Sequence, residues 1–281
     1  MKTKYVPGLI KRTGILLFIL TISLLCYGQS QNGRVLSSDT NSGIGYVNIG
    51  VIGGNIGTVT DASGNFTLAI DESYDNDSIR FSMIGYESKT LLISQFKNDT
   101  KIYIYLNPKS YNLPEIKVVY RRPKGIRIGT EVTTNTLRSG FASNELGSEL
   151  GVKIHVRGLV RLEDIKFNVA ICTYDSVTYR LNIYEKYNDK EYRNILIKPI
   201  YITFSKEKIN EVITFDLKNY QILIEGDVLI ALELYKDMGE GRLLFHTQFF
   251  TGTTYHRKTS EGDWTESSGV IGMYLNGLKI K

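Results

Sequence analysis

The chain has 281 residues, of which 42% are hydrophobic and 22% are charged, and its formal net charge is +5. Lys2, Lys4, Lys11 and Arg12 supply four of these charges within the first 28 residues, so the rest of the chain carries 5 − 4 = +1. A nearly neutral surface does not attract polyanions over long range, which excludes nucleic acid as the main partner. The roughly 250 residues after this basic start are enough for two domains.

The basic start is followed by an apolar run over residues 15–25 and then by small residues that include Gly28. This order is typical of a secretory signal peptide, and the run is shorter than the ~20 residues of a membrane-spanning helix. We predict a signal peptide at residues 1–28 and no transmembrane helix in the mature chain. Lipid attachment at Cys26 would tether the protein to a membrane. The residue before it is Leu25, whereas lipoprotein signals usually have a small residue there, so tethering is the minor alternative and stays open.

Residues 31–120 show a pattern of short strands separated by Gly, Asn and Asp. Alternation with period two, as in Phe66, Leu68 and Ile70, places one set of side chains on the core face of a sheet. We expect strands near residues 47–51, 66–70, 78–83, 87–93, 101–106 and 115–120. Short strands at regular spacing, with no helical segment between them, predict a β-sandwich.

A tight turn is expected where Asp61 precedes Gly64. The Asp61 carboxylate can accept bonds from nearby backbone N–H groups, and Gly64 can adopt a positive φ, so the two would close a hairpin between Val59 and Phe66. Gly57 and the other conspicuous glycines of this region are interpreted as turn residues and not as a phosphate-binding loop.

Several short motifs occur here in a consistent order: Gly33-Arg34-Val35, Tyr46-Val47-Asn48-Ile49, Gly57 to Asp61, Gly64-Asn65-Phe66, Phe81-Ser82 and Ile84-Gly85-Tyr86. In this pattern residues 31–120 resemble the carboxypeptidase-regulatory-like domain. The resemblance implies a transthyretin-like or immunoglobulin-like sandwich of seven strands, without catalysis, of a kind found at the start of exported and outer-membrane proteins of Gram-negative bacteria. Its structural motif residues would be Gly57, Asp61, Gly64, Phe66, Gly85 and Tyr86.

The segment 113–119, Leu-Pro-Glu-Ile-Lys-Val-Val, resembles the one that joins this domain to the plug of TonB-dependent receptors. A plug and a barrel of many hundred residues would have to follow it, and the sequence ends at Lys281. We therefore expect an accessory protein and not a complete receptor.

Residues 121–145 are interpreted as a linker, because Pro123 and several glycines lie in a stretch of small polar residues that bury little surface. Alternation resumes in residues 146–281, where Val177, Tyr179 and Leu181 oppose polar neighbours. We expect a second sandwich, jelly-roll-like, with Pro199 marking an edge strand. The strands are expected near residues 152–157, 165–172, 177–183, 195–204, 212–217, 228–235, 242–247 and 270–280.

Common catalytic constellations are missing from the sequence. None of His155, His246 and His256 precedes a Glu by three residues, as a zinc carboxypeptidase requires, and Cys172 lies in an apolar strand without an activating motif. The acidic loop that holds Asp71, Glu72, Asp75 and Asp77 lacks the spacing of a calcium-binding loop. We therefore expect no enzymatic activity, no metal and no cofactor.

Aromatic and basic residues of the second half offer a sharper hypothesis. Tyr184 and Arg180 share one strand face, and Tyr255, Arg257 and Trp264 flank a predicted hairpin. Aromatic faces beside polar donors suit a sugar or a peptide, although such residues also pack within sandwiches. Tyr103 and Tyr105 in the first half are open to the same two interpretations.

The function predicted from the sequence is that of a non-enzymatic binding or assembly module, exported to the periplasm or the outer membrane. Its partner would be a protein or glycan of the cell envelope. One alternative is a carbohydrate-binding protein. Another is a peptidase or glycan hydrolase with its site in the second domain, for which Asp216 and Glu233 are candidate carboxylates.

Overall fold

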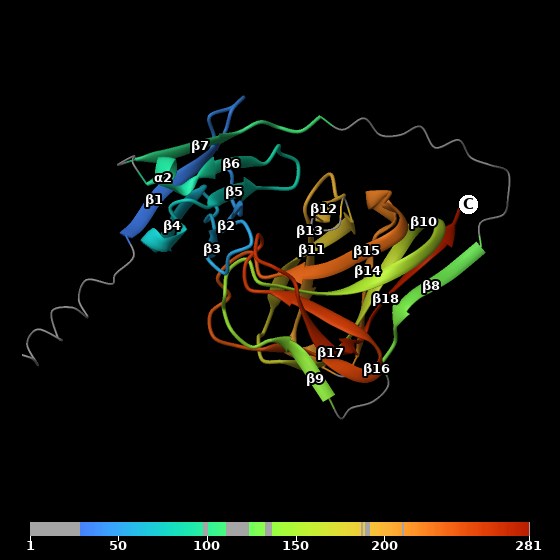
Figure 1. Cartoon of the computed structure of the whole chain (residues 1–281). Helices are drawn as coiled ribbons and strands as arrows, with labels where there is room; N and C mark the ends of the chain where they lie inside the picture. Colours follow the sequence, from blue (N-terminus) through green and yellow to red (C-terminus); the bar gives the residue numbers. More distant parts are fainter. Residues whose placement is uncertain are drawn as a thin grey trace, which may run out of the picture.

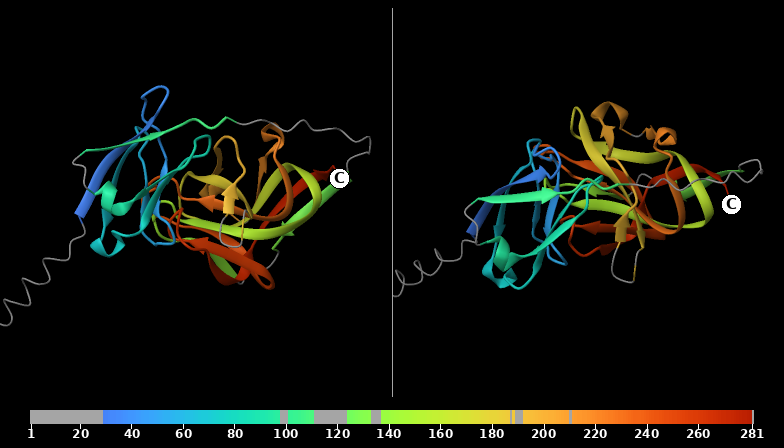
Figure 2. Two further views of the ribbon diagram at one scale, coloured as in Figure 1. Left: turned by 45° about the horizontal axis from the view of Figure 1, so that its top comes forward. Right: turned by 90° about the horizontal axis from the view of Figure 1, so that it is seen from above.

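The computed structural model describes residues 29–97, 101–110, 124–132, 137–186, 188, 192–209 and 211–280. The predicted signal peptide, the segment 113–119 and the strand expected at 115–120 lie outside these residues. The fold is all-β, as predicted, and forms two domains that lie side by side (Figures 1 and 2). Within the described part of the chain, no helix has the length and apolar character needed to cross a membrane.

The N-terminal domain packs two sheets against each other. One has the order β4-β1-β7 and the other the order β3-β2-β5-β6, which together give seven strands among the described residues. The elements are β1 (Gln29–Ser37), β2 (Asn48–Val51), β3 (Gly57–Val59), β4 (Asn65–Ile70), a 3-10 turn (Glu72–Tyr74), β5 (Ser78–Ser82), β6 (Lys89–Leu92), α2 (Ile93–Phe96) and β7 (Ile102–Leu106).

The core of this domain follows from the alternation in the sequence. In β4 and β7 every second residue is buried, and Phe66, Phe81 and Phe96 meet with ring centroids 5.9–6.2 Å apart. Such contacts between rings add to the free energy gained by burying their apolar area. The predicted strands are thus confirmed where the structure describes them.

The turn predicted at Asp61 is confirmed, but the hairpin is not. The Asp61 carboxylate accepts the backbone N–H groups of Ser63 at 2.8 Å and Asn65 at 2.9 Å, and Gly64 has φ +86°. However, β3 pairs with β2 and β4 pairs with β1, so the turn carries the chain from one sheet to the other. Alternation specifies which side chains face the core, but it does not specify which strand becomes the partner.

Among its described residues, the C-terminal domain has eleven strands that are linked by hydrogen bonds into one continuous sheet. They are β8 (Lys124–Thr130), β9 (Leu137–Phe141), β10 (Glu149–Cys172), β11 (Val177–Lys186), β12 (Tyr192–Asn194), β13 (Ile200–Phe204), β14 (Val212–Asp216), β15 (Leu223–Glu233), β16 (Leu243–Arg257), β17 (Thr265–Ile271) and β18 (Met273–Lys279), with 3-10 turns at Lys206–Lys208 and Lys218–Tyr220.

β10 makes this continuity possible because it changes partners along its length. Its first part pairs with β15 and β16, its middle part pairs with β14 and β18, and its last residues, Val169–Cys172, pair with β16 again. The strands expected at 152–157 and 165–172 are therefore one strand of 24 residues, with an irregularity between Val156 and Val160 where Gly158 has φ +79°. The buried side chains of this sheet form one apolar core that includes Phe167, Phe204 and Phe245.

The predicted linker needs correction. Residues 124–130 form β8, which pairs with β18, and residues 137–141 form β9, which pairs with β16. Most side chains of these strands remain at least partly exposed, and Ile128 and Phe141 are the buried ones. With so few apolar anchors among small polar residues, the alternation is too weak to indicate strands. Pro199 directly precedes β13, which pairs with β11.

The two domains meet where the turn between β16 and β17 packs on the outer face of the sheet β3-β2-β5-β6. Gly50 and Gly57 are direct neighbours across β2 and β3, and a Cβ added at either would lie within 3.0 Å of Glu261 or Thr259. The N–H of Gly53 also donates to the Glu261 carbonyl at 2.9 Å. Gly57 is therefore a close-contact residue in a strand and not the turn residue expected from the sequence.

We expect Gly50→Val to separate the domains without unfolding either of them. A Cβ at this position would lie 2.9 Å from the Glu261 Cβ, whereas the core face of β2 is untouched. Small-angle scattering should show a larger radius of gyration, with the circular dichroism spectrum unchanged. The matched control is Gly125→Val, where an added Cβ meets nothing within 4 Å. Unchanged scattering from Gly50→Val would contradict the assigned contact.

Candidate functional site

A row of four charged residues crosses the face of the C-terminal sheet that is turned toward the N-terminal domain. Arg180 of β11 is directly opposite Glu233 of β15, Glu233 is opposite Glu149 of β10, and Glu149 is opposite Arg257 of β16. Glu149, Arg180 and Glu233 are each at most 1% exposed. Like charges in directly opposed positions destabilise a sheet. Here each carboxylate has an arginine on its outer side.

Arg180 connects the two domains. It binds Glu233 through two bonds of 2.7 and 2.9 Å, and it donates to the Tyr46 carbonyl at 2.8 Å and to the Asn48 Oδ1 at 2.7 Å. Its fifth donor faces the Met83 sulfur at 3.3 Å. Because all five N–H groups have partners, the buried guanidinium is fully satisfied. A charge buried in this way rigidifies the structure and leaves no donor for a ligand.

Glu149 is the second centre of the network. Its carboxylate accepts bonds from the Nε and Nη2 atoms of Arg257, the nearer at 2.5 Å, from the Tyr184 hydroxyl at 2.9 Å and from Asn182 at 3.2 Å. Asn182 also donates to Glu233 at 2.6 Å and so joins the two carboxylates. The guanidinium of Arg257 lies over the Trp264 ring at 4.5 Å from its centroid.

The two carboxylates have pKa values shifted in opposite directions. Burial raises the pKa of Glu149 to about 7, against the attraction of Arg257 and with a further increase from the charge of Glu233. Burial also acts to raise the pKa of Glu233, but the charge and hydrogen bonds of Arg180 lower it below its usual value. The net charge of the row therefore changes with pH through the ionisation of Glu149.

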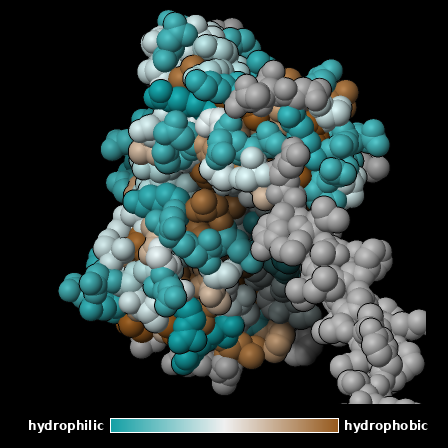
Figure 3. Space-filling model, turned by 90° about the vertical axis from the view of Figure 1, so that its left-hand side faces the viewer, coloured by the Kyte–Doolittle hydropathy of each residue, from teal (hydrophilic) through white to brown (hydrophobic). Residues whose placement is uncertain are grey.

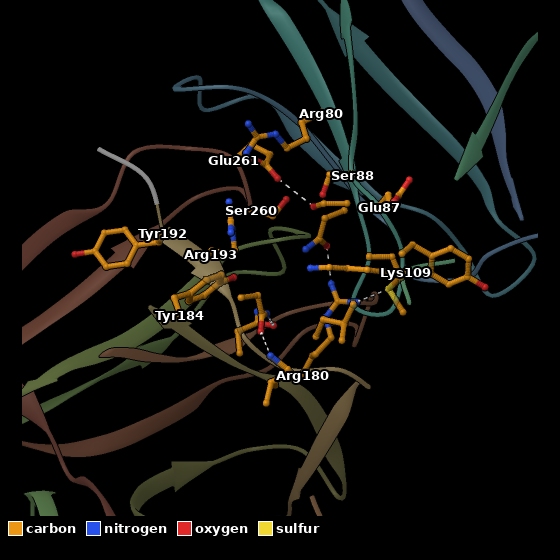
Figure 4. Close-up of a pocket in the computed structure, with 18 of the residues that line it drawn as sticks. Arg80, Glu87, Ser88, Lys109, Arg180, Tyr184, Tyr192, Arg193, Ser260 and Glu261 are labelled. Carbon is orange, nitrogen blue, oxygen red and sulfur yellow. Dashed lines mark hydrogen bonds and ion pairs between the residues drawn. The ribbon is translucent and has the colours of Figure 1, made fainter. Parts of the chain in front are cut away.

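A cleft of about 420 Å³ opens beside this network, between the two domains (Figure 4). Its walls are two sheet faces. The residues from the N-terminal face are Asn48, Arg80, Ser82 and Thr90, and those from the C-terminal face are Arg180, Asn182, Tyr184, Tyr192 and Asn194, with Arg193 of the same strand at the rim. The rim and floor add Met83, Ile84, Tyr86, Glu87, Ser88, Lys109, Leu196, Arg257, Ser260 and Glu261.

Two neighbours in the β16–β17 turn, Ser260 and Glu261, line the cleft in different ways. The Glu261 carboxylate is held by Arg80 at 3.3 Å and by the Ser82 hydroxyl at 3.1 Å, and burial raises its pKa. Ser260 is 4% exposed, and its hydroxyl has no hydrogen-bond partner. Buried polar atoms normally have partners, so an unsatisfied one on a cleft wall requires an explanation.

The five residues singled out in the sequence lie close together. Arg180, Tyr184 and Arg257 line the cleft, and Trp264 packs against Tyr184 with ring centroids 6.0 Å apart. Tyr255 joins the same apolar cluster and lines a separate depression beside His155 and Asp227. None of these positions tests ligand binding. Because all five N–H donors of Arg180 have partners within the protein, this residue holds the wall of the cleft in place and has no donor left for a ligand.

Sequence reasoning missed Glu149 and the N-terminal wall of the cleft. A signal for the acidic partners was present, because Glu233 interrupts the apolar run from Val228 to Leu234 and a charge within such a run must be paired. No comparable signal marked Arg80 or Ser82, which occupy the polar positions of an ordinary alternating strand.

Comparison with known proteins identifies the family of the first domain. Residues 31–118 match the family model of the CarboxypepD_reg-like domain. The N-terminal sandwich is a CarboxypepD_reg-like domain. No curated protein matches the chain. Among solved structures, a chain from "Structure of infectious bursal disease virus Gx strain" covers 92% of this chain and 68% of its own length, with 11% identity and a TM-score of 0.15, which is too low to carry an argument.

Beyond the CarboxypepD_reg-like domain, the carboxylate pair considered for hydrolysis is not assembled. Asp216 pairs with Asp164, whereas Glu233 lies between Arg180 and Glu149. The acidic loop of the CarboxypepD_reg-like domain holds a lysine, because Lys97 binds Asp75 at 2.6 Å. In the described part of the chain, no group of three or more His, Cys, Asp or Glu side chains could hold a metal ion.

The histidines and Cys172 have protein partners or lie in the core, whereas two candidate tyrosines remain exposed. His155 contacts Asp227 at 2.7 Å and His256 contacts Ser267 at 3.1 Å. His246 and Cys172 are buried, and burial raises the pKa of the Cys172 thiol, which keeps it unreactive. Tyr103 and Tyr105 remain 54% and 44% exposed on β7, so packing does not account for them.

We expect Arg180→Met to lower the free energy of unfolding by about 3–5 kcal/mol, because it leaves Glu233 buried without its cation. The double variant Arg180→Met/Glu233→Met should recover at least half of this loss, since neither charge remains. Urea denaturation gives both values. Lys206→Met, which breaks an exposed ion pair with Asp175, is the control and should change little. Simple additivity of Arg180→Met and Glu233→Met would contradict the coupling.

We expect a pH effect that depends on Glu149. Its folded-state pKa of about 7 lies above the unfolded value of ~4.3, so its stabilising contribution is complete below pH ~4.3 and is lost as pH rises toward 7. Between pH 5 and pH 8 the free energy of unfolding should fall by about 2 kcal/mol relative to Glu149→Gln. Urea denaturation across this range measures the difference. Parallel pH profiles for the two proteins would refute the assignment.

Proposed function

We propose that this protein is a non-enzymatic binding module that is exported to the bacterial cell envelope, and that its ligand occupies the cleft between its two domains. The observation that carries the proposal is the cleft itself. It is formed by side chains from both domains, and the buried hydroxyl of Ser260 on its wall lacks a partner. Its volume falls within the ~300–1,000 Å³ of typical small-molecule sites.

The state of the buried carboxylates favours binding over catalysis. A general acid or base must reach a proton on the substrate directly or through one water. Glu149 and Glu233 are fully buried, and their oxygens are engaged by Arg257, Arg180 and Asn182. Their opposite pKa shifts resemble those of a catalytic pair, but these carboxylates hold the wall of the cleft in place.

The exposed hydrophobic residues do not suggest a different main site. Those of large size in the described residues are scattered over the molecule, among them Ile52, Leu92, Ile197 and Phe249, and the pair Tyr103 and Tyr105 on β7 is the one case in which two share a strand face. On the face shown in Figure 3, hydrophobic residues form small patches between hydrophilic ones. A broad apolar patch would have favoured assembly with another protein, so the cleft is the better candidate.

Export is supported by the order of regions in residues 1–28, which is typical of a signal peptide. It is also supported by the resemblance of the CarboxypepD_reg-like domain to modules of exported proteins. The periplasm or outer membrane is the proposed location, and a glycan or protein of the envelope is the proposed partner.

Ser88→Trp tests location and ligand site together. Ser88 is exposed on the rim, so an indole there would fill part of the cleft without disturbing the core. The full chain with a C-terminal tag, expressed in a Gram-negative host, should be recovered from the envelope fraction. We expect bound glycan or peptide, measured by mass spectrometry, with the wild type and at least tenfold less with Ser88→Trp.

Ser94→Trp is the matched control, because Ser94 is exposed on α2 and does not line the cleft. It should retain as much material as the wild type. Equal retention by both Trp variants would move the site elsewhere, and recovery only from the cytosol would overturn export. Turnover of a peptide or glycoside substrate by the purified protein would refute the non-enzymatic assignment.

A further inference from the structure

A second depression lies on the same face of the C-terminal sheet as the row of four charges beside the cleft. It has a volume of about 260 Å³ and is lined by Lys153, His155, Asp227, Thr253 and Tyr255. On β10, Glu149, Lys153 and His155 lie an even number of residues apart, and the pairing with β15 is regular over this stretch. Alternate residues of a strand face the same side of a sheet. The sheet face beside the cleft therefore continues to the second depression.

An aromatic cluster connects the two depressions. Tyr184, Leu229 and Ala231 are buried at its base, and Tyr192, Tyr255 and Trp264 pack against them while remaining partly exposed. Tyr192 lines the cleft, whereas Tyr255 lines the second depression. Figure 4 shows Tyr184 and Tyr192 together at one side of the cleft. The surface between the cleft and the second depression thus consists of aromatic rings.

The length of this surface indicates a ligand that is a chain. Glu149 stands beside the cleft, because it binds Arg257 and Tyr184 of its lining, and His155 lies in the second depression. The two residues are 155 − 149 = 6 positions apart on β10. At ~3.3 Å per residue this separation is ~20 Å. A molecule that occupies both depressions must therefore contain several units.

The charged side chains of this surface are of both signs and are largely paired within the protein. Arg180 is paired with Glu233, Arg257 with Glu149, Arg80 with Glu261 and His155 with Asp227. Lys109 and Arg193 also have interactions of their own, and Glu87 accepts a bond from Asn107. Only a lining of one sign concentrates ligands of the opposite sign. The surface therefore favours an uncharged ligand.

The remaining groups suit the recognition of sugars. Tyr184 is paired with Asn194 across β11 and β12, and His155 is paired with Asp227 across β10 and β15, so the backbone of these strands is used in the sheet. A peptide that binds by adding a strand to a free edge is poorly served by such a face. Hydroxyls and amides line both depressions, and they donate and accept hydrogen bonds as sugar hydroxyls do. Tyrosine adds an apolar ring face beside a polar tip.

From these observations, and resting on the proposed function, we propose that the cleft, the aromatic cluster and the second depression form one continuous site for an unbranched neutral oligosaccharide. Its sugar rings pack on Tyr192, Tyr255 and Trp264, and its hydroxyls bond with the polar side chains of the two depressions. Each depression holds only part of the chain. The affinity therefore rises with the length of the oligosaccharide until both depressions are occupied.

The experiment is isothermal titration calorimetry of the full mature chain with cellohexaose and maltohexaose, which differ in linkage, and with their disaccharides cellobiose and maltose. Hexagalacturonate is the acidic counterpart, and an end-blocked hexapeptide of serine and glycine is the peptide counterpart. We expect one neutral hexasaccharide to bind at least tenfold more tightly than its disaccharide and both counterparts, with an affinity that added salt does not change. Binding of neither hexasaccharide, or tighter binding of a disaccharide or counterpart, would overturn the inference.

Tyr255→Ala tests the aromatic cluster. Removal of this ring should weaken binding of the hexasaccharide at least fivefold and leave both the thermal midpoint and the affinity for the disaccharide unchanged. Tyr255→Phe, which keeps the ring, should retain the affinity. Tyr103→Ala is the matched control, because Tyr103 is also exposed but lies outside both depressions. Equal affinity of Tyr255→Ala and the wild type would contradict the role of this ring, as would an equal loss for the disaccharide.

Thr253→Trp tests the second depression, which an indole at this position would fill. The affinity for the hexasaccharide should fall to that for the disaccharide, whereas Thr214→Trp, on the exposed side of β14, should have no effect. Binding that is lost with Ser88→Trp but is unchanged with Thr253→Trp would overturn this inference and retain the cleft as the site. Binding that is unchanged with Ser88→Trp would instead overturn the proposed function.

Discussion

The row of charges Arg180–Glu233–Glu149–Arg257 is the constraint on which the rest of the structure depends. Burying three of these charges beside a fourth that is only partly exposed is costly unless every one is paired and hydrogen-bonded, and four adjacent strands must keep their register to place them in one line. A slip of one residue in any of these strands would turn its charge into the apolar core. The row thus fixes the register of β11, β15, β10 and β16. At its Arg180 end it also fixes the position of the neighbouring domain.

The CarboxypepD_reg-like domain shows the other half of this arrangement. All four residues of β2 are buried, although alternation alone would expose every second one. Asn48 accepts a bond from Arg180, and Gly50 admits the β16–β17 turn. Tyr46 has φ +62°, a conformation that bulky residues rarely adopt, and its carbonyl accepts a bond from Arg180 while its ring packs on Tyr235. The outer face of this sheet is therefore adapted to its neighbour and not to water.

The sequence predicted what depends on local pattern. Period-two alternation identified the strands around Phe66 and Tyr179, and the Asp61 turn followed from the chemistry of its residues. The pairing of segments that lie far apart in the sequence could not be predicted from local pattern. Alternation does not show that Glu149 faces Arg257 across the sheet, or that Gly57 lies against Thr259. The same limit explains the incorrect prediction of a linker at β8 and β9. Their few apolar residues can be recognised as strand residues only when the pairing of β8 with β18 and of β9 with β16 is known.

The position of the cleft follows from the fact that the C-terminal domain covers only part of the outer face of the sheet β3-β2-β5-β6. The β16–β17 turn covers the sheet β3-β2-β5-β6 at Gly50 and Gly57, whereas Arg80, Ser82 and Thr90 on β5 and β6 line the cleft. Glu261 stands at the boundary, since it packs on Gly50 and binds Arg80 and Ser82. A molecule in the cleft would touch the same turn that holds the domains together. Ligand binding and the contact between the two domains would then be thermodynamically coupled, so that each stabilises the other.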